Sequence, residues 1–98
     1  MTESFNRVFV LLLDEPRIGT THVCLYMALY HFYLLNNCKS PVRVTRAELM
    51  RASKIRGLAT YHRCLKDLVA LGFIKYEPSF HPGVESRIWL VGVQVREI

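Results

Sequence analysis

The feature that most constrains the fold of this chain is the order of elements that its pattern predicts between Val42 and Val91. Apolar spacing and turn residues indicate a short strand, two helices joined by a tight turn, and a two-stranded hairpin. The predicted elements cover residues 42–44, 45–53, 58–71, 73–77 and 87–91. This order is the layout of a winged helix, in which the second helix of a helix-turn-helix is presented to the major groove of DNA.

Local signals support these boundaries. Thr45 and Glu48 have the spacing of a capping box, in which each side chain bonds the backbone N–H of the other residue. Gly57 is the expected N-cap of the second helix, Gly72 is the residue expected to end it, and Ile55 is expected to enter the core at the turn. Apolar residues at spacings of three and four form the expected core face of the second helix: Tyr61, Cys64, Leu65, Leu68 and Leu71.

Two further segments are predicted before Val42. Residues 4–13 have the pattern of a short amphipathic or buried helix, although the apolar run 9–13 could also form a strand, and Pro16 and Gly19 end it. A long helix then begins at an N-cap, Thr20 or Thr21, and ends near residue 36. Its expected core face recurs at helical spacing: Leu25, Ala28, Leu29 and Phe32.

The long helix is apolar around most of its circumference. A core of this size covers one face, and leaving the large side chains of the second face in water would forgo ~1.5–3 kcal/mol for each. We therefore expect a homodimer, with the N-terminal segment 1–19 contributing. The alternative is that residues 5–13 fold back on the same chain and cover this face alone. The expected dimer residues are Val23, Met27, Tyr30 and Leu34.

Positive charge is concentrated on the predicted helix-turn-helix. The net charge of the chain is +5, whereas residues 42–66 alone carry seven bases and one acid, Glu48. The remainder of the chain is therefore slightly acidic. The bases are Arg43, Arg46, Arg51, Lys54, Arg56, Arg63 and Lys66. Such a concentration of charge on one supersecondary unit is typical of proteins that bind polyanions.

Side chains near the start of the second helix are the ones that would reach base edges. Arg63 can donate two bonds to guanine, Thr60 can bond a base or a phosphate, and Ala59 can contact a thymine methyl group. The predicted base-reading set is Ala59, Thr60, His62 and Arg63. The predicted phosphate-binding set is Arg46, Lys54, Arg56 and Lys66. The candidate wing contacts are His81 and Arg87, in a hairpin with fewer bases than a DNA-binding wing usually carries.

The sequence favours a non-enzymatic protein. It has no paired carboxylates, no glycine-rich phosphate loop and no nucleophile–base spacing, so we expect no cofactor. Three cysteines, Cys24, Cys38 and Cys64, have neither paired nor metal-ligand spacing, which argues against disulfides and a metal site. No 18-residue apolar run or cleavage site is present, so we expect no membrane partner and a cytoplasmic location. No small-molecule effector is evident. Trp89 could belong to the core or to a dimer surface.

Several segments resemble one group of known proteins. These are ATYHRCLKDL (residues 59–68), GFIKYEPSFHP (72–82), ELM (48–50), SKI (53–55) and LYMAL (25–29). They are similar to segments of small winged-helix transcriptional regulators encoded on bacterial plasmids and conjugative transposons. The resemblance covers roughly residues 20–91. It implies a DNA-binding role in regulation or in maintenance of a mobile element.

The sequence thus predicts one α+β, mostly α domain spanning residues 1–98, with a winged helix-turn-helix core at 20–91, comprising three helices and a β-hairpin wing, and an extra N-terminal segment. Its predicted function is sequence-specific binding of double-stranded DNA as a homodimer that controls transcription. Two alternatives are an accessory factor for excision or replication of a mobile element, and a winged helix used as a protein-interaction module. The excess of bases favours DNA, because a docking module does not need it.

Overall fold

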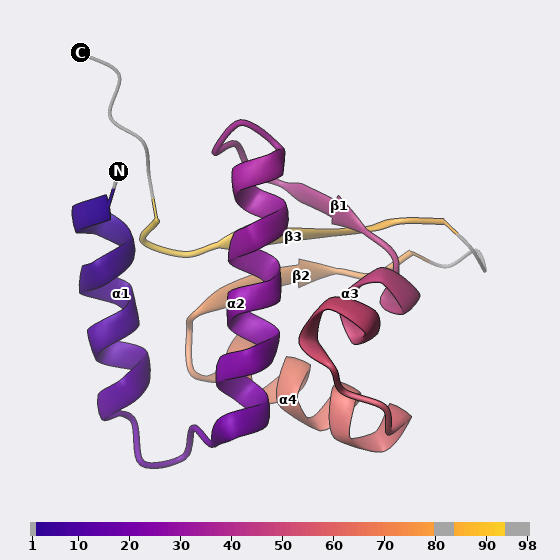
Figure 1. Cartoon of the computed structure of the whole chain (residues 1–98), viewed down its shortest axis with the longest axis horizontal. Helices are drawn as coiled ribbons and strands as arrows, with labels where there is room; N and C mark the ends of the chain where they lie inside the picture. Colours follow the sequence, from indigo (N-terminus) through magenta and orange to yellow (C-terminus); the bar gives the residue numbers. More distant parts are fainter. Residues whose placement is uncertain (1, 80–83, 94–98) are drawn as a thin grey trace.

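The computed structural model describes residues 2–79 and 84–93, with side chains described from Phe5 onward. Within these ranges the chain is an α+β, mostly helical domain, as the sequence predicted (Figure 1). No helix of the described residues is long and apolar enough to cross a membrane. The elements are α1 (Thr2–Asp14), α2 (Thr20–Leu35), β1 (Val42–Val44), α3 (Arg46–Ser53), α4 (Leu58–Ala70), β2 (Ile74–Glu77) and β3 (Ser86–Leu90).

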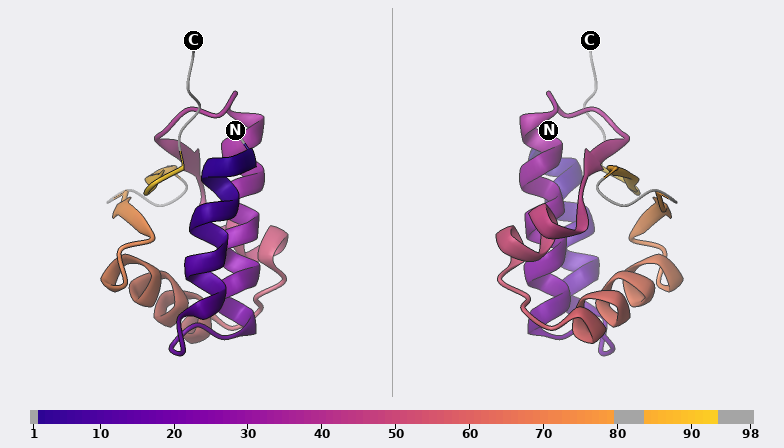
Figure 2. Two further views of the ribbon diagram at one scale, coloured as in Figure 1. Left: turned by 90° about the vertical axis from the view of Figure 1, so that its left-hand side faces the viewer. Right: turned by 90° about the vertical axis from the view of Figure 1, so that its right-hand side faces the viewer.

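The strands form one antiparallel sheet with β3 in the centre, in the order β1-β3-β2. Val42 lies opposite Ile88, and Ile74 lies opposite Leu90, so the buried side chains of the three strands point to the same face. α2 and α4 lie on that side of the sheet (Figure 2). We call the other side the outer sheet face. Its residues are Arg43, Lys75, Glu77, Arg87 and Trp89.

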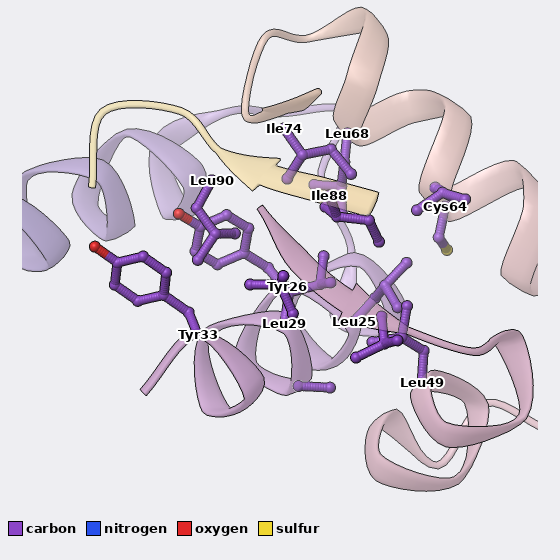
Figure 3. Close-up of a cluster of buried hydrophobic side chains, with 14 of the residues drawn as sticks. Leu25, Tyr26, Leu29, Tyr33, Leu49, Cys64, Leu68, Ile74, Ile88 and Leu90 are labelled. Carbon is purple, nitrogen blue, oxygen red and sulfur yellow. The ribbon is translucent and has the colours of Figure 1, made fainter. Parts of the chain in front are cut away.

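α2 runs through the middle of the core and contacts α3, α4, β1 and β3 (Figure 3). Because it has neighbours on several sides, its buried arc is wider than one predicted stripe. Leu25, Ala28 and Leu29 are buried as predicted. Phe32 is only partly buried, and the prediction missed Tyr26 and Tyr33, which are almost completely buried.

The N-terminal segment is a helix, so the strand alternative was wrong. α1 folds back beside α2, and the Phe5 and Tyr30 rings stack with centroids 3.9 Å apart (Figure 1). At its other edge Val8 packs against Gly92, where an added Cβ would lie 3.1 Å from the Val8 side chain and where φ is +82°. The positive φ favours glycine at position 92, and a side chain there would also press on Val8.

This arrangement corrects part of the predicted dimer surface. Tyr30 and Val23 are half-buried and pack against the chain's own core, so part of each side chain is already covered within the chain. Met27 and Leu34 remain 39% and 40% exposed. The alternative in which the N-terminal segment covers α2 therefore holds for Tyr30, which stacks on Phe5, and not for Met27 and Leu34.

Candidate nucleic-acid interface

α3, the first helix of the predicted helix-turn-helix, is held at both ends by short polar contacts. At its start the predicted capping box is confirmed: Glu48 N–H donates to Thr45 Oγ1 at 3.1 Å, and Thr45 N–H donates to Glu48 Oε1 at 2.9 Å. At its end the Ser53 hydroxyl donates to the Leu49 carbonyl at 2.6 Å. Lys54 then adopts a left-handed conformation with φ of 65°, which stops the helix and starts the turn.

The turn exposes its charged residues because its apolar residue is anchored. Ile55 is buried in the core, as predicted, and it lies between exposed Lys54 and Arg56. An open hollow of about 520 Å³ lies here, lined by Met50, Arg51, Lys54, Ile55 and Arg56. Arg51 was not in the predicted phosphate set. Its position in the last turn of α3, next to Lys54, was the signal that could have placed it there.

α4 has one buried face and one exposed face, with Gly57 as its N-cap as predicted. The buried face contains the predicted Tyr61, Cys64, Leu65 and Leu68. Burial raises the pKa of Tyr61 to about 12, and the positive charge of Arg46 nearby acts in the opposite direction. The exposed face carries Ala59, His62, Arg63 and Lys66, which share one stripe at spacings of three and four. Thr60 is half-buried at the edge of this stripe.

Two polar contacts that sequence reasoning missed fix α4 against the start of α2. The Gly19 N–H donates to His22 Nδ1 at 3.0 Å, which makes Nδ1 an acceptor and leaves Nε2–H to donate to Asp67 Oδ2 at 2.8 Å. The Cys64 thiol also donates to the Thr21 hydroxyl at 3.2 Å. His22 is buried, and through it α2 sets the position of α4.

The residues of this anchor were considered in the sequence analysis, but they were given other roles. Gly19, and not Thr20 or Thr21, is the N-cap of α2: its backbone is extended, and its own N–H is accepted by the ring of His22 at position N3. Asp67 was placed on the outer face of its helix, but it lies at the edge of the buried stripe, within reach of His22.

Positive charge on this part of the molecule is not neutralised by neighbouring acids. Of the two acids here, Glu48 is held by the cap, where the hydrogen bond from the Thr45 backbone keeps its pKa below the ordinary value, and Asp67 accepts from His22. Among the described residues, none of the six bases on α3, the turn and α4 forms an ion pair. We call these exposed bases, together with exposed Ala59 and His62, the basic surface: Arg46, Arg51, Lys54, Arg56, Ala59, His62, Arg63 and Lys66.

The remaining candidates lie elsewhere. Arg43, counted with the bases of the helix-turn-helix, lies on the outer sheet face. Arg87 lies on the same face and is ion-paired with Glu77 across the hairpin, so its charge is already compensated. His81 lies outside the described residues. Of the predicted wing contacts, the structure therefore describes only one, at the base of the hairpin.

A second surface on α1 and α2 has a different composition. α2 contains no Asp, Glu, Lys or Arg. We call the exposed aliphatic residues of these two helices, together with Met27, the apolar surface: Val10, Leu11, Leu13, Met27, Leu34 and Leu35. Cys24, also exposed, lies on the same side of α2 as Met27 and Leu34, at spacings of three and seven.

Comparisons of the chain with protein-family models, with curated proteins and with solved structures found no match. The functional argument therefore depends on the residues of the two surfaces themselves.

Proposed function

We propose that this chain is a winged-helix protein that binds double-stranded DNA through α4 and regulates transcription. The observation that carries the proposal is the exposed stripe of α4 beside bases that have no acidic partner among the described residues. The element order from α2 to β3 and the sheet order β1-β3-β2 support the proposal, since a winged helix has this order and presents the helix that corresponds to α4 to DNA.

Base reading would come from the first half of the α4 stripe. A helix fits the B-DNA major groove, which is about 12 Å wide, and small residues at its start let it approach closely. Ala59 supplies the small residue, and Arg63 supplies the donor pair that matches guanine O6 and N7. The anchor between His22 and Asp67 holds this stripe in a fixed orientation relative to the core.

Phosphate binding would come from the turn. The hollow lined by Arg51, Lys54 and Arg56 offers three cationic side chains to one strand of the duplex. Contacts of this kind position a protein on DNA and supply affinity without sequence preference.

Two experiments test the proposal. Selection of duplexes from a random pool identifies the preferred site: a palindrome supports a dimeric regulator, direct repeats favour an accessory factor of a mobile element, and no enrichment contradicts sequence-specific binding. Titration of a labelled duplex at several salt concentrations tests the basic surface. With about four to eight phosphates neutralised per dimer, affinity should fall roughly 100- to 10,000-fold between about 50 and 200 mM salt. Salt-independent binding would contradict the proposal.

We further propose that a second copy of the chain covers the apolar surface. Interface cores are depleted of charge and enriched in Met, and α2 exposes Met27 and Leu34 on a helix without charged residues. A two-fold contact there would bury aliphatic residues of α1 and α2 from both copies. It would also allow the two α4 helices to enter successive major grooves, about 34 Å apart.

A further inference from the structure

The outer sheet face is separate from both surfaces described above. Trp89 lies on it, on the central strand, directly opposite Lys75 of β2. This tryptophan is partly exposed and belongs neither to the buried core nor to the side chains packed against it. It is also the only tryptophan of the chain. A large aromatic side chain on the solvent side of a sheet is a feature that core packing does not explain.

The charges on this face are not balanced. Arg43 and Arg87 are direct cross-strand neighbours, and like charges in that position destabilise a sheet. Glu77 is ion-paired with Arg87 and compensates only one of the two. Arg43 and Lys75 form no ion pair within the described part of the chain. Three cations against one acid therefore surround Trp89.

A hollow of about 540 Å³ continues this face at the edge of β1. It shares Arg43 with the face, and Phe32, Leu35 and Pro41 give it an apolar side. Asn36, Ser40 and Glu85 make the rest of its lining polar. An aromatic ring and two cations without an ion pair thus lie on one face of the sheet, and a hollow of mixed polarity adjoins this face at Arg43.

We propose that the outer sheet face binds single-stranded DNA, with a base stacked on Trp89 and backbone phosphates held by Arg43 and Lys75. Neighbouring strands lie about 4.8 Å apart, so β1 and β2 lie roughly 10 Å apart on the two sides of β3. Lys75 is directly opposite Trp89, and Arg43 lies diagonally from it, opposite Arg87. Single strands are bound by this combination of a stacking ring and a cationic track.

The unpaired form of DNA is the partner that fits. In a duplex the bases are stacked on one another and their faces cannot meet Trp89, whereas a single strand exposes them. The choice of DNA over RNA rests on the proposed function, because a protein that holds a duplex through α4 meets single-stranded DNA wherever that duplex opens. The site would then hold a strand that has been released near the bound duplex.

The full chain allows a direct test, because Trp89 is its single indole fluorophore. Titration with oligo(dT) should quench the tryptophan emission and give saturable binding that weakens with salt. By anisotropy of a labelled oligo(dT), Trp89→Thr should lower affinity roughly tenfold, since stacking on one aromatic ring contributes that order of effect. Arg43→Ser with Lys75→Ser should lower it as well and should reduce the salt dependence.

A matched pair of variants separates this site from α4. Arg63→Ala should weaken binding to the preferred duplex and leave oligo(dT) affinity within about twofold, whereas Trp89→Thr should do the reverse. Circular dichroism establishes that each variant is folded. Unchanged emission, full affinity of both sheet variants, or stronger binding of oligo(rU) than of oligo(dT) overturns the proposal. If the unmodified chain binds oligo(dT) but no duplex, the role of α4 is contradicted and the sheet site stands.

Discussion

The basic surface and the apolar surface belong to the same small domain but have opposite chemistry. On α3, the turn and α4, the exposed residues include six bases, and the two acids are both bound, Glu48 in a helix cap and Asp67 to His22. On α1 and α2, the exposed residues include six large apolar side chains, and α2 has no Asp, Glu, Lys or Arg. Solubility alone would favour mixed charge on both surfaces. This difference is what we expect if, as proposed, the first surface binds a polyanion and the second is covered by an apolar protein surface.

The two surfaces are also supported differently. α4 is fixed by His22, Asp67, Thr21 and Cys64, which link it to the start of α2 through polar contacts. α1 is held by apolar packing of Val8 and Leu12 and by the stack of Phe5 on Tyr30. Directional contacts suit a surface that must read bases in a fixed register, whereas apolar packing is less directional and suits a surface that only has to be buried.

The largest expected effect is on the apolar surface. Met27→Lys should shift a dimer to monomers, because a two-fold interface would bury the new charge once in each copy. In the monomer the lysine is tolerated, because position 27 is partly exposed and the ammonium group can reach water. Loss of about 3 kcal/mol across the two copies corresponds to a dissociation constant roughly 100-fold higher. Sedimentation equilibrium at micromolar protein measures this dissociation constant.

Val69→Lys is the matched control, because Val69 is a helical aliphatic residue that is 40% exposed, as Met27 is 39% exposed, but lies on α4. It should leave the association state unchanged. Cys24 gives an independent readout, since a dimer should protect this exposed thiol from modification at high protein concentration. A wild-type chain that sediments as a monomer, with equally reactive Cys24 at all concentrations, removes the dimer and the expectation of a palindromic site.

The next effect concerns the basic surface. Arg63→Ala should cost ~1–3 kcal/mol on the preferred duplex and relax the preference at one base pair. Lys54→Asn should weaken binding to all duplexes about equally and should lower the slope of log affinity against log salt concentration by about one. Asn tolerates the left-handed conformation of Lys54, so this variant removes the charge without new backbone strain. Equal losses on specific and non-specific duplexes in both variants would show that α4 does not read the sequence.

A smaller effect tests the support of the basic surface. Thr45→Ala should destabilise the domain by about 1 kcal/mol, because Glu48 N–H loses its acceptor at the start of α3. Glu48 adds a pH dependence. Its pKa is lower in the folded chain than the ordinary 4.5, so its contribution is present above that value and is lost as the pH falls through the folded pKa. In urea unfolding at a series of pH values, the free energy of unfolding of Glu48→Gln should fall less at acidic pH than that of the unmodified chain. An identical fall would contradict the electrostatic role of the cap.

Local patterns made much of the fold predictable. The capping box, the glycines at positions 57 and 72, and the apolar stripe of α4 each depend on residues close together in the chain. They are found as expected except for Leu71, which is half-buried and follows the end of α4. The prediction failed where a contact joins distant segments. His22 and Asp67 are 45 residues apart, and neither position has a local pattern that reveals the other.

The same limit explains why the buried residues of α2 were predicted only in part. Periodicity showed that α2 is apolar on most sides, but it could not show which side would meet α1 and which the sheet. Tyr26 and Tyr33 are therefore core residues where Phe32 was expected, and Tyr30 is covered by Phe5 of the same chain. The candidate base-reading residues were predictable because exposure on α4 follows from one stripe. Arg51 was missed because its place depends on the turn geometry.

The smallest effect tests whether the core is independent of both surfaces. Tyr26 and Tyr33 lie side by side on the buried face of α2 (Figure 3). Burial raises the pKa of the Tyr26 hydroxyl well above its ordinary range, and this hydroxyl has no hydrogen-bond partner among the described residues. The Tyr33 hydroxyl donates to the Val93 carbonyl at 3.4 Å. A buried hydroxyl without a partner costs stability, whereas a bonded one contributes to it.

Tyr26→Phe should therefore raise the free energy of unfolding by about 1 kcal/mol, and Tyr33→Phe should lower it by roughly 0.5–1.5 kcal/mol. In a domain of this size, 1 kcal/mol shifts Tm by about 4–8 °C, which thermal unfolding resolves. Duplex affinity and association state should stay the same in both variants, because neither hydroxyl reaches the basic or the apolar surface. Destabilisation by Tyr26→Phe would mean that its hydroxyl bonds a group outside the described residues. Altered DNA binding would mean that the core and the basic surface are coupled through α2, and the two surfaces would then not be separable.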